Sequence, residues 1–247
     1  MRLSVLILCL STAVACNGDS DSDSDSPTGD SFIDSVLDAG WASDMTVGDG
    51  GGEFSFSGDG VPDHSVLEAY ALSDDTTIAV ASYSLSQTIP SAPVYSATTT
   101  DTGGGVIGVA VSGGVFFNPY EGDGVTIAVD SNFYVDGVPF LDTCNGHPLP
   151  TGETYHYHGI PYCISDVIDD AGEHSSLVGL LNDGFPVYGP NGEGGTAASG
   201  LDECSGHDSA TPEFPDGVYH YHFTEDQPYS IPCYHGEIEE QSGPPGP

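Results

Sequence analysis

The chain has 247 residues, with 38 Asp and Glu against a single Arg, Arg2, and no Lys, so its formal net charge at pH 7 with neutral histidines is −37. This length suits one large all-β domain or two small ones. The negative field opposes binding to nucleic acid and to anionic membranes, and it attracts cations. Solubility, a salty habitat and diffuse Ca²⁺ binding on the acidic surface are three competing explanations of this charge.

The first 30 residues are predicted to direct export. Residues 1–15 form the signal peptide, because a positive charge precedes an apolar run over residues 3–10 that is too short to span a bilayer. Small residues then precede Cys16, which resembles the lipobox of bacterial lipoproteins. We expect residues 16–30 to be a lipid anchor on Cys16 and an Asp/Ser tether, so that the protein is held at the cell envelope by lipid alone. Secretion after cleavage of a plain signal peptide is the alternative.

Residues 31–104 are predicted to form the N-terminal β part of the domain. The chain contains 34 Gly and 18 Pro, and short apolar runs between Gly, Pro, Asp and Ser are typical of an all-β fold with few or no long helices. Residues 32–41 are the one plausible short helix, because their apolar positions fall on one face. The predicted strands are 53–57, 77–82, 106–111, 125–129, 133–135, 177–181 and two Tyr-His segments.

The second half of the chain contains an internal duplication. Tyr-His-Tyr-His at 155–158 returns at 219–222, and each copy follows a Leu-Asp-x-Cys-x-Gly-His frame, at 141–147 and 201–207. The match extends upstream, from 106–119 to 177–190. We therefore predict repeat 1 over residues 105–176 and repeat 2 over 177–235, in a pseudo-twofold domain with its sites at the repeat interface and a disordered tail over 236–247.

Four cysteines follow the signal and anchor segments. An even number in an oxidising compartment indicates two disulfides, with three pairings open. The repeat favours one bridge in each copy. Metal binding by the sulfurs is the alternative, but the spacings lack the close cysteine pairs of zinc sites. The predicted bridges are Cys144–Cys163 and Cys204–Cys233.

The histidines of the repeat are the candidate metal ligands. Side chains alternate along a strand, so the two histidines of each Tyr-His segment lie on one face, about 7 Å apart at the backbone, with the tyrosines on the other face. Neutral imidazole outside the cell favours Cu or Zn over Mg or Ca. Asp142 and Asp202 recur in phase with the rings and are candidate acceptors for their second nitrogens. The candidate ligands are His64, His147, His156, His158, His207, His220 and His222, with His235 as a further candidate.

An ordered set of motifs resembles the YHYH family of exported proteins. The match spans about residues 58 to 236, and the resemblance implies a common site without an established activity. The motifs are Gly-Val-Pro-Asp-His at 60–64, Ile-Gly-Val-Ala at 107–110, the two Leu-Asp-x-Cys-x-Gly-His frames, the two Tyr-His-Tyr-His segments, Asp-Gly-Phe-Pro-Val-Tyr-Gly-Pro at 183–190, Gln-Pro-Tyr at 227–229 and Cys-Tyr-His-Gly at 233–236.

Two hypotheses follow for the function. The first is a protein that binds Cu or Zn through the duplicated His-x-His pairs, either as a binding protein or as a metal-dependent enzyme of unknown reaction. The second is a non-catalytic cell-surface interaction module in which the histidines form a structural hydrogen-bond network. Convergence of at least three imidazoles supports the first, and dispersed or mutually hydrogen-bonded rings support the second. Neither identifies the small molecule or surface partner. A nucleophile elbow and a P-loop are both absent from the sequence.

Overall fold

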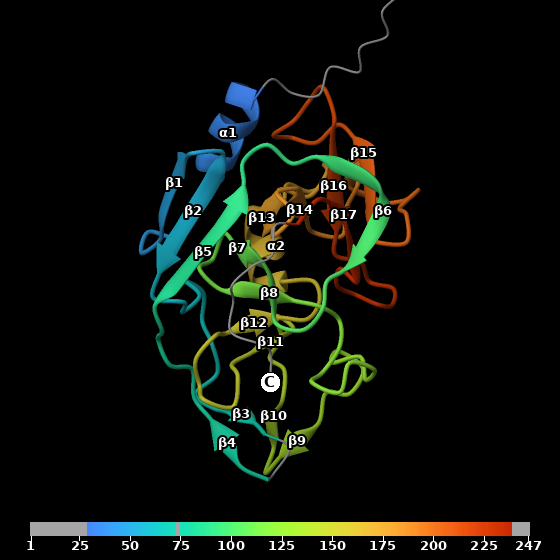
Figure 1. Ribbon diagram of the computed structural model, residues 1–247. Coiled ribbons are helices and arrows are strands. Elements are labelled where there is room, and N and C mark those ends of the chain that lie inside the picture. Colours follow the sequence, from blue (N-terminus) through green and yellow to red (C-terminus); the bar gives the residue numbers. More distant parts are fainter. Residues whose placement is uncertain (1–28, 73–74, 239–247) are drawn as a thin grey trace, which may run out of the picture.

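The computed structural model describes residues 29–72 and 75–238 (Figure 1). The predicted signal peptide, the Cys16 anchor, nearly all of the tether and residues 239–247 of the predicted tail lie outside these ranges. Gly236, which we expected to begin the tail, is instead the last residue of a strand. Within the described ranges, no helix is both long and apolar enough to cross a membrane.

The described chain is mostly β, with two short α-helices and one 3₁₀ turn. Helix α1 covers Gly29–Leu37, α2 covers Tyr162–Ile168 and η1 covers Glu193–Gly195. The predicted helix over 32–41 corresponds to α1, which ends four residues earlier. Trp41 lies beyond this end and donates its indole N–H to the carbonyl of Val36 at 2.7 Å, so it still contacts the helix.

An eight-stranded sheet forms the centre of the molecule. Its strands run in the order β11-β12-β8-β7-β13-β14-β16-β15. They cover Gly146–His147 (β11), His156–Tyr157 (β12), Val115–Phe117 (β8), Val106–Ala110 (β7), Leu177–Leu181 (β13), Pro186–Tyr188 (β14), Val218–His222 (β16) and Gly206–Ser209 (β15).

The two halves of this sheet pair their strands in the same way. In the first half, β7 is antiparallel to β8, β8 is parallel to β12, and β12 is antiparallel to β11. In the second half, β13 is antiparallel to β14, β14 is parallel to β16, and β16 is antiparallel to β15. The antiparallel pair β7 and β13 joins the halves, so each Tyr-His strand lies one strand in from an opposite edge.

Glycine allows the two central strands to approach closely. Gly108 of β7 and Gly179 of β13 occupy equivalent positions of the two halves. A Cβ at Gly108 would lie 2.5 Å from the carbonyl oxygen of Leu180, and one at Gly179 would collide with the carbonyl of Val109. The junction therefore requires glycine on both sides.

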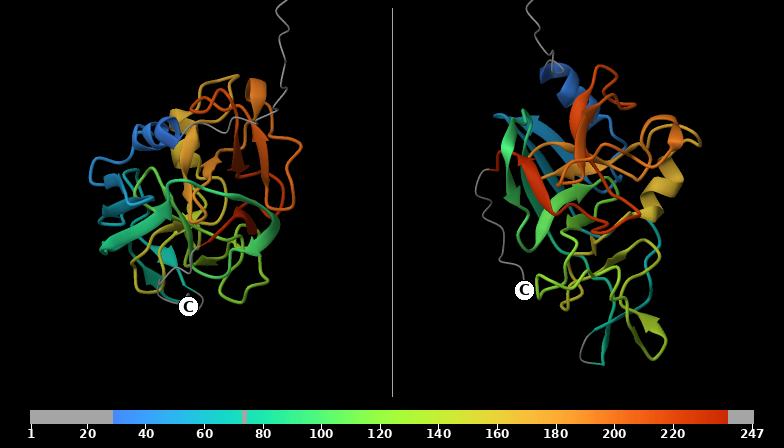
Figure 2. Two further views of the ribbon diagram at one scale, coloured as in Figure 1. Left: turned by 45° about the horizontal axis from the view of Figure 1, so that its top comes forward. Right: turned by 90° about the vertical axis from the view of Figure 1, so that its right-hand side faces the viewer.

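Smaller sheets surround the central one. Strands β1 (Thr46–Gly50), β2 (Glu53–Gly58) and β5 (Leu85–Pro90) form an antiparallel sheet beside α1, on the left of Figure 1. The long strand β6 (Tyr95–Asp101) pairs with β17 (Cys233–Gly236). Two two-stranded pairs, β3 (Tyr70–Ala71) with β4 (Thr77–Ile78) and β9 (Tyr134–Val135) with β10 (Val138–Pro139), lie together at the lower end of the molecule in Figure 1 and in the right-hand view of Figure 2.

Several predicted strands are confirmed, one predicted strand is wrong, and one helix was missed. The predictions over 53–57, 106–111 and 177–181 correspond to β2, β7 and β13, whereas 77–82 and 133–135 shrink to the two-residue strands β4 and β9. Residues 125–129 form turns with one isolated bridge, because Asp123 accepts hydrogen bonds from the backbone N–H of Val125 and Thr126 and fixes a turn. Helix α2 was not predicted; its apolar pattern is weak, since Val167 is 78% exposed.

Each half contains one disulfide. Cys144 is bonded to Cys163 and Cys204 to Cys233, which is the pairing that the repeat favoured. The first bridge ties the turn before β11 to helix α2, and the second ties the turn before β15 to β17. The turn that leads into each of the histidine-bearing strands β11 and β15 is thus fixed by a disulfide.

Candidate metal centres

The first histidine cluster comprises His147, His156 and His158. His147 in β11 lies opposite His156 in β12, and His158 follows β12 on the same face as His156. One nitrogen of each ring lies within 4.8 Å of the others, and all three side chains are buried. Strand alternation thus brings the predicted pair together, with ring centroids 4.8 Å apart, and the antiparallel register adds the third ring.

Backbone carbonyls fix two rings of this cluster. Nδ1 of His156 lies 2.8 Å from the carbonyl oxygen of Thr154, and Nδ1 of His158 lies 2.8 Å from that of Asn118. A carbonyl oxygen only accepts, so each Nδ1 carries the proton and the lone pair of the neutral ring is on Nε2. His147 is 7% exposed, and both of its ring nitrogens are buried without a hydrogen-bond partner.

The second cluster contains His207, His220 and His222 of the second half of the sheet and, in addition, His174. His207 in β15 lies opposite His220 in β16, as His147 lies opposite His156. Nε2 of His220 is 3.1 Å from Nε2 of His207 and 3.1 Å from Nε2 of His222. His174, which precedes β13, brings one ring nitrogen within 4.8 Å of those of His220 and His222.

All four rings of the second cluster place Nδ1 against a carbonyl oxygen. The Nδ1–oxygen distances lie between 2.7 and 3.1 Å. Each neutral ring therefore directs an Nε2 lone pair inward, and Nε2 of His174 has no hydrogen-bond partner. The acceptors are the carbonyls of Ser175 for His174, Ser199 for His207, Val218 for His220 and Gly189 for His222.

Burial keeps five of these rings, those of His147, His156, His158, His220 and His222, neutral at physiological pH. Desolvation, aided by neighbouring rings, lowers the pKa of His220 to about 2, and desolvation lowers the pKa of His222 to about 3 and that of His158 to about 4. The pKa values of His147 and His156 also lie well below 6.5 for the same reason. The contacts of 3.1 Å between Nε2 atoms therefore join two lone pairs with no proton between them, an arrangement that a cation stabilises.

A four-coordinate transition metal fits this geometry. A tetrahedral ion with metal–nitrogen bonds of about 2.0–2.1 Å separates its ligand nitrogens by about 3.3 Å. The observed contacts of 3.1 Å in the second cluster are close to that value. The triads His147, His156, His158 and His174, His220, His222 can thus each hold a metal ion.

Asp142 and Asp202 do not support the rings as we had expected. Asp142 instead accepts the hydroxyls of Tyr70 and Tyr155, both at 2.7 Å, and Asp202 accepts the hydroxyl of Tyr219 at 2.8 Å. Each carboxylate also accepts two backbone N–H groups of its own Asp-x-Cys-x-Gly turn. The carboxylates therefore fix the turns and the tyrosine face of each Tyr-His strand, and carbonyls support the imidazoles.

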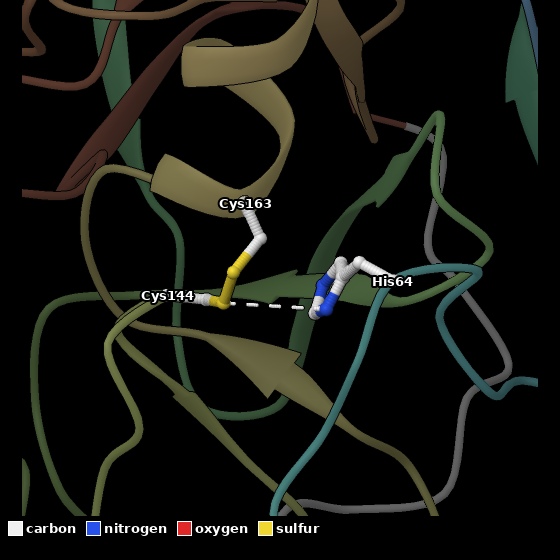
Figure 3. A group of neighbouring side chains, drawn as sticks. All are labelled: His64, Cys144 and Cys163. Atoms are coloured by element: carbon white, nitrogen blue, oxygen red, sulfur yellow. Dashed lines mark hydrogen bonds between the residues drawn. A yellow bond between two sulfur atoms is a disulfide. The ribbon is translucent and has the colours of Figure 1, made fainter.

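His64 and His235 lie apart from both clusters. Nε2 of His64 is 2.6 Å from the hydroxyl of Tyr157, and its Nδ1 is 4.0 Å from Sγ of Cys144 (Figure 3). The sulfur is bonded to Cys163 and supplies no thiolate. His235 lies correspondingly near Asp202, at 3.3 Å, on the tyrosine side of the second half. The structure thus separates His64 from the other predicted ligands.

The predicted histidines form two clusters and not one shared site. Strands β12 and β16 are separated by the four strands β8, β7, β13 and β14, or about 24 Å at about 4.8 Å a step. The prediction of a site at the repeat interface is therefore wrong. That interface is the junction of β7 and β13, and the histidine-bearing strands lie away from it on both sides. Sequence reasoning also missed His174, which lies three residues before β13, where the first half has Gly103. The only signal for it is its place just ahead of a buried strand.

The comparisons with known proteins identify a family. The family model described as YHYH protein matches residues 86–195 and 191–236, which is well over half of the chain. No curated protein and no solved structure matches the chain. The matched residues include both histidine clusters, both disulfides and all eight strands of the central sheet. The chain belongs to the YHYH protein family.

Proposed function

We propose that this protein binds transition metal, with one Cu or Zn ion in each histidine cluster. The observation that carries the proposal is the pair of 3.1 Å contacts between Nε2 atoms of His207, His220 and His222. Every Nδ1 there already donates to a carbonyl, so neutral rings have no proton to place between the nitrogens. A bound cation removes this repulsion between lone pairs.

A purely structural hydrogen-bond network explains the rings less well. Such a network needs a donor in each ring–ring contact, which requires either an Nε2 proton or an imidazolium ion. The carbonyls oppose the first, and burial of His220 and His222 opposes the second. In the first cluster the unpartnered nitrogens of His147 also contribute nothing to a network.

The ligand set favours Cu or Zn among the available metals. Neutral imidazole suits these borderline ions, and Ca²⁺ and Mg²⁺ require oxygen ligands. Both clusters consist of histidine alone. The cysteines near the tyrosine faces are bridged, so sulfur does not compete.

We also propose that the two halves of the sheet arose by internal duplication. The support is the repetition of local detail at equivalent positions. Each half has the same strand pairing, the same Asp–Tyr hydrogen bond and the same Nδ1–carbonyl acceptor two residues before its first ring. Asn145 and Ser205, at equivalent positions, share the left-handed backbone conformation, with φ of 57° and 66°.

Export with a lipid anchor on Cys16 is part of the proposal. The signal-like residues 1–15 support it, and two disulfides suit an oxidising compartment. In the native host, Cys16→Ser is expected to move the protein from the membrane fraction to the soluble exported fraction. Unchanged membrane association of this variant would contradict the anchor.

The test of the metal proposal is a metal count. The full-length chain, made without a histidine tag, is offered Cu²⁺ or Zn²⁺, dialysed extensively and analysed by mass spectrometry. We expect two ions per chain for the wild type, and one for each of the matched variants His156→Ala/His158→Ala and His220→Ala/His222→Ala. His64→Ala is the control, because His64 lies outside both clusters, and it should keep two ions.

The same count separates the clusters from the acidic surface. Ions held by surface carboxylates would be retained equally by all four proteins and would be lost at high salt. Retention of no metal, or equal retention in every variant, would contradict the proposal and favour the surface interaction module.

A further inference from the structure

The two clusters differ in their access to solvent. A cavity of about 860 Å³ is lined by all three rings of the first cluster, His147, His156 and His158. A second cavity of about 890 Å³ reaches the second cluster only at His207. A ligand in the first cavity therefore meets the whole set of metal-binding rings, and one in the second meets a single ring.

His174 explains this difference. It supplies a fourth imidazole to the second cluster, with ring centroids 5.4 Å and 5.0 Å from those of His220 and His222. The equivalent position of the first half is Gly103, which has no side chain and lines the first cavity. The first cluster thus has three imidazoles and a space where the second has a ring.

The walls of the first cavity indicate what it can accept. The described part of the chain contains no Lys or Arg, and the carboxylates of Asp101, Glu121 and Asp123 line this cavity, so its field opposes anions. Three phenylalanine rings, of Phe117, Phe133 and Phe140, provide apolar faces that also attract cations. Such walls suit a small neutral or cationic molecule with an apolar part.

We propose that the first cluster is an open metal site that binds a small neutral or cationic molecule through one nitrogen or oxygen donor, and that the second is a closed site of four imidazoles. This inference rests on the proposed metal binding. Closed sites with four protein ligands are typical of structural metals, whereas three protein ligands and an exchangeable position are typical of catalytic ones. The two halves therefore have different roles despite their common frame.

The test uses Co²⁺, whose visible absorption reports its coordination, in full-length chains with one intact cluster each. The variant His220→Gln/His222→Gln retains the first cluster, and His156→Gln/His158→Gln retains the second. Circular dichroism checks that each variant folds. If a double variant does not fold, the single variant His222→Gln or His158→Gln, respectively, is used in its place. Retained cobalt is counted before any ligand is added.

Imidazole is the neutral probe and azide the anionic one. Imidazole should shift the cobalt bands saturably, with one equivalent bound, in the chain with the first cluster only. The bands of the other chain should not respond until His174→Gly is added, which opens its fourth position. A third variant removes the negative charges of the first cavity by Asp101→Asn, Glu121→Gln and Asp123→Asn. It should strengthen azide binding at the first cluster severalfold and leave the affinity for imidazole within about twofold of its value before these substitutions.

The outcomes separate this inference from the proposal beneath it. Loss of cobalt from both single-cluster chains would overturn metal binding itself. Retained cobalt that responds to imidazole in both chains, or in neither, would overturn only the distinction between open and closed sites. A response of the second cluster that does not depend on His174 would do the same.

Discussion

Six of the seven clustered rings place Nδ1 against a backbone carbonyl, and His147 is the exception. Because the acceptors belong to the main chain, side-chain mutation at the acceptor residues leaves the tautomer unchanged. The fold therefore determines that Nε2 is the atom available to a metal. His147 gains its position from the turn before β11 and from Phe140, whose ring centroid is 4.1 Å away.

The carboxylate of Asp142 is expected to contribute more to stability than its counterpart Asp202. Asp142 is buried and accepts two tyrosine hydroxyls, whereas Asp202 accepts one and is 25% exposed. Asp142→Asn removes the negative charge that strengthens these hydrogen bonds and places an amide N–H₂, which is itself a donor, where a carboxylate oxygen accepted. It should lower the free energy of unfolding by about 2–4 kcal/mol. Asp202→Asn should cost about half as much.

Urea unfolding of both variants with their disulfides intact measures this difference. Loss of stability should appear as a lower midpoint with an unchanged slope. An equal effect at the two positions, or a larger one at Asp202, would show that burial does not control the contribution.

Single residues of the site were predictable to different degrees. The repeat and strand alternation predicted six of the clustered histidines. These are His147, His156, His158, His207, His220 and His222. His174 could not follow from the repeat, because the other copy has Gly103 there. His64 was grouped with them by residue type alone, and its neighbours are instead Tyr157 and the first disulfide.

The order of the strands in the central sheet could not be predicted from the sequence. A repeated motif predicts two equal units but does not state which strands join them. The junction of β7 and β13 places the Tyr-His strands far apart in one sheet, which converts the expected shared site into two. Helix α2 was likewise hidden, since a disulfide at Cys163 and burial of Ile164 hold it with little apolar periodicity.

The β7–β13 junction is expected to be intolerant of any side chain. Gly179→Ala places a Cβ against the carbonyl of Val109 and the ring of Phe116, in a strand whose residues are all buried. We expect a loss of about 3 kcal/mol or more in the free energy of unfolding, because backbone on both strands has to move. Gly108→Ala should behave in the same way, and denaturant titration measures both.

Gly50→Ala is the matched control for this pair. Gly50 ends β1, and a Cβ there meets nothing within 4 Å. Its effect should stay within about 0.5 kcal/mol. A tolerated alanine at Gly179 would show that the two halves are not held as closely as the strand register indicates.

The metal-free molecule is expected to lose stability as the pH falls below about 6.5. His147, His156, His220 and His222 have lower pKa values folded than unfolded, so below 6.5 the unfolded chain binds more protons. Each such ring contributes nothing to the pH dependence above 6.5 and costs up to about 1.4 kcal/mol per pH unit below it. Several rings acting together should unfold the chelated protein between pH 6 and 5.

Thermal melts of the chelated protein from pH 8 to pH 5 measure this dependence. His222→Gln should reduce the slope by about one proton, because it removes one of the titrating rings. Carboxylates of ordinary pKa titrate near 4 and contribute below this window. A flat profile between pH 7 and pH 5 would show that the rings are protonated or exposed in the folded chain.

Each disulfide fixes a turn that leads directly into a strand with a metal-binding ring. Cys144 lies between Asp142 and His147, and its bond to Cys163 holds that turn against helix α2. A chain with free thiols has His147 on an untied loop and offers its sulfurs as competing ligands. Assembly then has an order, in which the oxidant acts first and the metal enters second. The compartment that oxidises the cysteines, with the metal ions present there, would thereby decide which metal the protein acquires.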